Sequence, residues 1–156
     1  MRVENDILIP ELARLLNEGK EVRFTPSGVS MRPFIEGDRD SVILAPLTRA
    51  PRVGDILLAK AQTEPQRTFY VLHRLIRIEK ISDTETRLVL QGDGNLSGEE
   101  YCSPADVIGL VKRIESPSGR RKPLTRGRIW YHLKPLRGFL LKIYRHTILI
   151  WYYENN

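Results

Sequence analysis

The chain has 156 residues, of which 41% are hydrophobic, and this is enough to build one ordinary domain with a single core. A single cysteine, Cys102, excludes an internal disulfide framework. The three histidines are scattered along the sequence, and together with the single cysteine they do not have the spacing of a zinc site. We therefore expect no metal and no cofactor. The formal net charge of +6 is uneven, because residues 112–145 hold eleven Lys and Arg side chains against one acid, Glu115.

The first predicted element is a short amphipathic helix within residues 8–18. Leu12, Leu15 and Leu16 recur at helical spacing, and Gly19 follows the expected end. The segment MRVENDILIP has no basic stretch leading into an apolar run of signal-peptide length. No stretch of the chain approaches the roughly 20 apolar residues of a membrane span. We expect a cytoplasmic location, in which the protein is either free or bound to the inner face of the membrane.

Six short apolar runs, separated by Gly, Pro and Asp, fill most of residues 21–115. They are rich in Val, Ile and Leu, which is typical of strands in an antiparallel sheet or half-open barrel. The runs are EVRFTP, DSVILAP, GDILLAKA, TFYVLHRLIRIEKI, TRLVLQGD and DVIGLVKRIE. The sequence therefore predicts a mainly β core over residues 21–115, preceded by an N-terminal helix in residues 1–20 and followed by a basic tail in residues 116–156.

The basic tail begins with a polar segment, SPSGRRKP, which is typical of a loop or linker. A helical period then places an apolar face opposite Lys142 and Arg145. The residues of that face are Leu136, Phe139, Leu140, Ile143, Ile150 and Trp151. Such a helix either docks on the protein's own core or another subunit, or contributes to binding an anionic membrane surface through residues 112–151.

Nucleic-acid binding is a further interpretation of the basic residues 112–145, which also contain Trp130 and Tyr131. Charge alone is a poor guide to such binding, and no recognised nucleic-acid motif accompanies it. We do not expect a nucleic-acid partner. Oligomeric state stays open.

The candidate nucleophile is Ser30, in the segment SGVSMRP between a predicted strand and a predicted turn. A serine in a glycine-containing bend can present its hydroxyl in the open, with backbone N–H groups nearby to stabilise an oxyanion. Ordinary turn chemistry explains the same residues. Activation at neutral pH also requires a neighbouring base.

The best candidate base is His73, in the middle of the run TFYVLHRLIRI. Strand alternation puts it on the same face as Val71 and Leu75. An imidazole on such an apolar face keeps a pKa near or below its free value, so it stays neutral and can accept a proton. A core histidine bonded to a backbone carbonyl is the alternative interpretation. His132 and His146 lie in the basic tail and are weaker candidates.

A carboxylate that fixes the histidine tautomer would complete such a site. Asp93 lies in the tight turn QGDGN that closes a predicted strand, and Glu99 and Glu100 follow within reach. Gly-Asp-Gly-Asn is also ordinary turn sequence.

Five motifs from Gly28 to Arg113 resemble, in their order, the boxes of type I signal peptidases and of the related LexA-like self-cleaving repressors. They read Gly-Val-Ser-Met-Arg-Pro, Val-Gly-Asp-Ile-Leu-Leu, Val-Leu-His-Arg-Leu, Gln-Gly-Asp-Gly-Asn and Val-Ile-Gly-Leu-Val. The resemblance implies a half-open antiparallel β-barrel as catalytic core. It is nearest to the archaeal and endoplasmic-reticulum branch, in which histidine followed by arginine replaces the lysine base.

By this resemblance Ser30 is the nucleophile and His73, followed by Arg74, is the general base. Asp93 is then the orienting acid, and Glu99 stands where a second acid would fall, replacing the usual Asp.

Gly28, Val29 and Met31 belong, by the same resemblance, to the nucleophile and oxyanion loop. Many signal peptidases carry a serine at the position of Gly28, so the backbone N–H of Ser30 would supply most of the oxyanion stabilisation. The pair Gly54-Asp55 looks like a structural turn.

The resemblance implies a serine endopeptidase that cleaves an extended peptide or precursor through a Ser-His-Asp site. The repressors cut an Ala-Gly or Cys-Gly bond of their own chain, and neither dipeptide occurs here, which favours cleavage in trans. The alternative is a catalytically inactive module on the same fold that binds a peptide or partner. Loss of the Ser30 hydroxyl would leave the binding of a peptide or partner by such a module unchanged.

Overall fold

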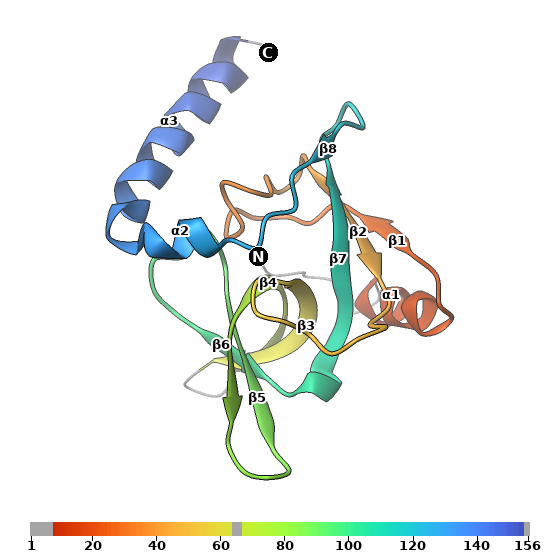
Figure 1. Cartoon of the computed structure of the whole chain (residues 1–156). Coiled ribbons are helices and arrows are strands. Elements are labelled where there is room, and N and C mark those ends of the chain that lie inside the picture. Colours follow the sequence, from red (N-terminus) through yellow and green to blue (C-terminus); the bar gives the residue numbers. More distant parts are fainter. Residues whose placement is uncertain (1–7, 64–66, 155–156) are drawn as a thin grey trace.

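The computed structural model describes residues 8–63 and 67–154, which form one strongly curved antiparallel sheet with a helix near each end of the chain (Figure 1). The helices are α1 (Leu8–Asn17), α2 (Arg128–His132) and α3 (Arg137–Glu154), with 3₁₀ turns η1 (Pro104–Asp106) and η2 (Lys134–Leu136). The strands are β1 (Val22–Phe24), β2 (Ser41–Ala45), β3 (Ile56–Thr63), β4 (Arg67–Lys80), β5 (Thr86–Gln91), β6 (Glu100–Cys102), β7 (Val107–Glu115) and β8 (Arg121–Lys122). Of the predicted N-terminal segment, residues 1–20, the structure therefore describes the part from Leu8 onward. Of the predicted tail, residues 116–156, it describes the part up to Glu154.

The sheet forms a partial ring. Its strands follow the order β1-β2-β7-β3-β4-β5-β6, β8 pairs with β7, and an additional pairing of β6 with β3 joins one end of the sheet back to its middle. All the strand pairings are antiparallel. The antiparallel, mainly β prediction is confirmed, but the half-open barrel is corrected to a partial ring, because this closure passes through a single residue pair, Gln62 with Tyr101.

Strand β4 separates two apolar clusters, because successive side chains of a strand point to opposite faces. Leu72 packs with Leu58 and with the apolar face of α1. Val71 and Leu75 pack on the other face with residues that include Leu90. Neighbouring residues of β4 therefore enter different environments, and this alternation continues through the centre of the strand.

Helix α1 covers one of these clusters with Leu12 and Leu16, which are buried. Its contact with β7 depends on Gly109, where a Cβ atom would lie 2.8 Å from Leu16 Cδ1. The predicted N-terminal helix is therefore confirmed and is part of the core.

The six predicted strands are all present, as β1 to β5 and β7. Two short strands were not predicted, β6 and β8, and β8 lies within the segment predicted to be a loop. Neither lies in an apolar run: β6 reads Glu-Tyr-Cys and β8 reads Arg-Lys, so no hydrophobic period marks them in the sequence.

The C-terminal helix is confirmed as α3, but its orientation corrects one interpretation. Leu141 is buried, whereas Phe139 and Ile143 are 65% and 46% exposed. The expected apolar face therefore does not dock on the described part of the core. Within the described residues no helix is long and apolar enough to cross a membrane.

Candidate active site

Ser30 lies in a turn six residues beyond the end of β1, and residues that follow it anchor the turn in the core. The side chains of Met31 and Ile35 are fully buried in the cluster beneath α1. Gly28 has a positive φ of 90°, a conformation in which a residue with a side chain is strained. The apolar anchors fix the backbone while the side chain of Ser30 stays partly exposed.

Ser30 and His73 are in hydrogen-bond contact, with 2.9 Å between Ser30 Oγ and His73 Nε2. The other ring nitrogen, Nδ1, lies 2.9 Å from Glu100 Oε2. The three side chains therefore form a continuous hydroxyl, imidazole and carboxylate chain, which is the arrangement that activates a serine by general-base catalysis.

The protonation of His73 follows from its two partners. An ionised carboxylate accepts hydrogen bonds and cannot donate them, so Glu100 selects the tautomer with the proton on Nδ1. Nε2 is then the lone-pair nitrogen that faces Ser30 Oγ. Burial lowers the pKa of His73 below its usual 6.5, and the hydrogen bond to Glu100 opposes part of that shift. The imidazole is thus held neutral and ready to accept a proton.

Glu100 replaces Asp93 as the carboxylate that contacts His73. It belongs to β6, where Glu100 and Cys102 are buried and Tyr101 between them is partly exposed. Cys102 belongs to the same apolar cluster as Val71, so Glu100 points to the face of the sheet that also carries His73. The alternation in Glu-Tyr-Cys, with cysteine as the inward residue, is the sequence signal that could have selected Glu100.

Asp93 is fully buried and its carboxylate is bound to Arg74. Arg74 donates from Nε to Oδ1 over 2.8 Å and from Nη2 to Oδ2 over 2.7 Å. The expectation that Asp93 orients His73 is therefore corrected. Its carboxylate is engaged on the opposite face of β4, because Arg74 follows His73 directly along the strand.

Arg74 uses its remaining contacts to hold surrounding backbone. Its Nη1 donates to the carbonyl of Gly54 over 2.8 Å and to that of Thr125 over 2.7 Å. The Asp93 carbonyl in turn accepts hydrogen bonds from Trp130 Nε1 and Arg137 Nη2, each over 2.7 Å. The region after β8 is therefore bonded to the turn that follows β5.

The glycines of that turn allow it to approach the candidate nucleophile closely. A Cβ atom on Gly92 would lie 2.5 Å from the Ser30 carbonyl oxygen and 3.0 Å from His73 Nε2. The N–H of Gly94 donates to the Ser30 carbonyl over 2.7 Å. The Gly-Asp-Gly motif thus positions the backbone of Ser30 and leaves room for the imidazole.

The other predicted acid, Glu99, points away from the site. It forms an ion pair with Arg77 on the surface, 2.9 Å from Nη2 to Oε2. This hydrogen bond lowers the pKa of Glu99. Of the other predicted loop residues, Val29 is exposed beside Ser30.

Other reactive groups of the described region offer no second centre. Cys102 is buried, and this burial raises the pKa of its thiol to about 12, so it is not a thiolate at neutral pH. Among the described residues no group of three or more His, Cys, Asp or Glu side chains could hold a metal ion. His132 and His146 are exposed, on α2 and α3.

Comparisons of this chain with protein-family models, with curated proteins and with solved structures found no match.

Proposed function

We propose that this protein is a serine endopeptidase of the signal-peptidase type, with Ser30 as nucleophile, His73 as general base and Glu100 as orienting acid. The observation that carries the proposal is the 2.9 Å contact between Ser30 Oγ and the buried His73 Nε2, whose Nδ1 faces a carboxylate. A histidine satisfied by a backbone carbonyl would not make this pair of contacts. The motif order that resembles signal peptidases and LexA-like repressors supports the same assignment.

In this mechanism Ser30 Oγ attacks the carbonyl carbon of the scissile peptide bond while His73 Nε2 takes the hydroxyl proton. The tetrahedral oxyanion is stabilised by backbone N–H groups of the turn, since Gly28 offers no hydroxyl. The C–N bond breaks as the imidazolium returns the proton to the leaving amine, and an ester to Ser30 remains. A water molecule, deprotonated by His73, then hydrolyses the ester and regenerates the serine.

The substrate in this proposal is an extended peptide that adds to a strand edge near the site. Strand β1 pairs only with β2 among the described strands and leads directly into the turn of Ser30. Its outer edge therefore offers backbone donors and acceptors in line with the nucleophile. By resemblance to the family, small side chains fit beside the cut.

The test is cleavage of a mixture of synthetic peptides of varied sequence, read by mass spectrometry and compared with Ser30→Ala. We expect cleavage at a restricted set of sites by the native chain and none by the variant. A peptide that binds the native chain and Ser30→Ala with equal affinity, and is cut by neither, would instead establish the non-catalytic binding module.

A further inference from the structure

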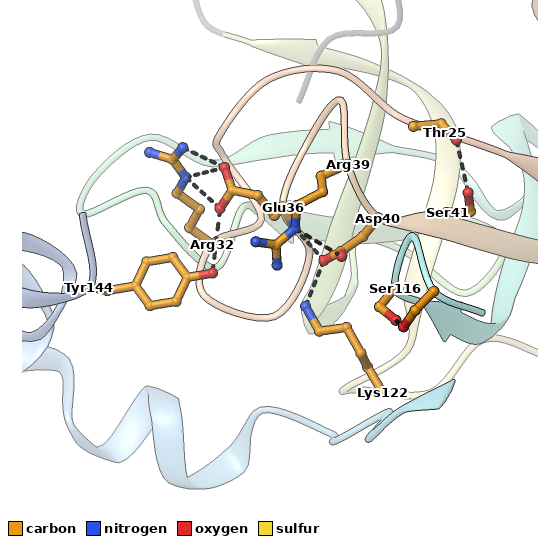
Figure 2. Close-up of polar contacts among 10 residues, drawn as sticks. Thr25, Arg32, Glu36, Arg39, Asp40, Ser41, Ser116, Lys122 and Tyr144 are labelled. Atoms are coloured by element: carbon orange, nitrogen blue, oxygen red, sulfur yellow. Dashed lines mark hydrogen bonds and ion pairs between the residues drawn. The ribbon is translucent and has the colours of Figure 1, made fainter. Parts of the chain in front are cut away.

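Helix α3 presents two opposite faces, and among its described side chains the buried ones gather on one face. Arg137 and Leu141 are buried, and Tyr144, one turn further, donates to Glu36 Oε2 over 3.4 Å (Figure 2). Glu36 is also bound by Arg32, so this face is attached to the loop that follows Ser30. The helix then runs out beyond the sheet (Figure 1).

The opposite face carries an exposed apolar stripe. We define it by four residues that recur three, four and seven positions apart on one side, the first at the end of η2 and the other three on α3. They are Leu136, Phe139, Ile143 and Ile150, with exposed fractions of 53%, 65%, 46% and 45%. Large exposed apolar side chains on one side of a described helix mark an interaction site. The exposed His146 and Thr147 lie between Ile143 and Ile150 on this side.

The charged side chains between residue 116 and the last residue of α3, Glu154, are all cationic. Residues 116–153 contain nine Lys and Arg side chains and no Asp or Glu. Lys142 and Arg145 are exposed and line a surface hollow together with Phe139 and Ile143, so they border the stripe and do not lie opposite it as the helical period alone predicted. Apolar side chains bordered by cations are the composition of helices that lie in the interface of anionic bilayers.

A second copy of the chain fits this surface less well. Two such helices would bring together cations with no acidic side chain between residues 116 and 153 to compensate them. The stripe also covers about two heptads, whereas coiled coils are recognised over at least three or four heptads. Charge complementarity therefore selects an anionic occupant.

We infer that the apolar stripe of α3 and its neighbouring cations bind the interface of an anionic phospholipid bilayer, with the helix in the membrane plane. This inference does not rest on the proposed peptidase activity. Arg137 lies on the same helix and bonds the carbonyls of Asp93 and Asn95, so a bound bilayer would be held at a fixed position relative to the turn beside Ser30.

The test is co-sedimentation of the purified full-length chain with vesicles of phosphatidylcholine alone and of phosphatidylcholine mixed with phosphatidylglycerol. We expect binding to the mixed vesicles and at least tenfold weaker binding to the neutral ones. Raising the salt concentration should weaken binding to the mixed vesicles, because screening reduces attraction between exposed charges. Ser30→Ala should bind both kinds of vesicle as the native chain does.

Matched variants separate the stripe from general surface hydrophobicity. Phe139→Ser and Ile143→Ser should each weaken binding to the mixed vesicles about tenfold, since each loses the burial of one large apolar side chain. Ile78→Ser and Ile81→Ser are the controls, because these residues are 43% and 48% exposed on the β4–β5 hairpin, and their variants should bind normally. Lys142→Gln and Arg145→Gln should each weaken binding about fivefold.

Two results would overturn the inference. One is equal binding, or no binding, to neutral and anionic vesicles by the folded chain. The other is a dimer in light scattering that Phe139→Ser and Ile143→Ser convert to a monomer while vesicle binding stays unchanged, which would assign the stripe to a second copy.

Discussion

His73 and Arg74 are neighbours on β4, and each meets a carboxylate on its own face of the sheet. His73 contacts Glu100 with one ring nitrogen and keeps the other against a partly exposed hydroxyl. Arg74 is bound twice by Asp93 and gives its remaining bonds to backbone carbonyls. Two adjacent residues, each bonded to a carboxylate, thus occupy very different surroundings.

The role of each buried carboxylate therefore depends on the side chain to which it is bonded. An imidazole can gain and lose a proton near neutral pH, so the His73–Glu100 pair can take part in proton transfer. A guanidinium stays protonated, so the Arg74–Asp93 pair can only hold structure in place. We expect variants of the first pair to change reactivity and variants of the second to change stability.

The largest expected effect is that of Glu100→Gln on reactivity. Without the carboxylate, His73 loses the partner that selects its tautomer and stabilises the imidazolium. The rate at which Ser30 reacts with a fluorophosphonate should fall roughly 10³- to 10⁴-fold, equivalent to about 4–5 kcal/mol. Intact-mass spectrometry over time measures this rate, and a fall of less than tenfold in a folded variant would remove Glu100 from the site.

Asp93→Asn should mainly lower the free energy of unfolding, by about 3–5 kcal/mol, because it leaves the buried Arg74 without a compensating charge. Chemical denaturation measures the change. Glu99→Gln is the matched control, since its ion pair with Arg77 lies at the surface and should contribute less than about 1 kcal/mol. Equal effects of the two variants would contradict a structural role for Asp93.

Gly92→Ala tests how closely the turn after β5 packs against the backbone of Ser30. The added methyl would lie 2.5 Å from the Ser30 carbonyl oxygen, so either Ser30 or the turn has to move. We expect roughly a 100-fold slower reaction of Ser30 with the fluorophosphonate, as for a reacting group displaced by about 1 Å. Gly138→Ala on α3, where the added atom would make an ordinary contact of 3.4 Å, should react at the native rate.

The smallest effect concerns pH. The fluorophosphonate reaction requires neutral His73, so its rate should rise with pH and reach a plateau. Burial lowers the pKa of His73, which places the midpoint of the rise below 6.5. The residual reaction of Glu100→Gln should have a midpoint at still lower pH, because Glu100 raises the pKa of His73. A midpoint that rises in this variant would contradict the assigned contact.

Much of this arrangement could be predicted from the sequence. The apolar runs predicted the main strands, and alternation within TFYVLHRLIRI placed His73 on the face of Val71 and Leu75. The choice among three nearby acids was missed, because the alternation in Glu-Tyr-Cys favours Glu100 only if these residues form a strand, and that depends on their pairing with β5. In that pairing Glu100 lies opposite Leu90 on β5, which turns its side chain toward His73.

The tail was harder to predict, for a different physical reason. A helical period identifies an apolar face but not the surface that the face meets. Leu141 contacts the protein body, and the more regular stripe of Phe139 and Ile143 is exposed. The bonds from Trp130 and Arg137 to the Asp93 carbonyl join segments distant in sequence, and no local pattern encodes them.

The most direct test of the central claim is the identity of the residue that a fluorophosphonate modifies. The native chain, Ser30→Ala and His73→Ala would be treated side by side, with folding checked by circular dichroism and the modified peptide located by mass spectrometry. We predict one adduct, on Ser30, that is absent from both variants. An adduct on Ser30 that forms at the native rate in His73→Ala, or no adduct on the folded native chain, would contradict activation of Ser30 by His73.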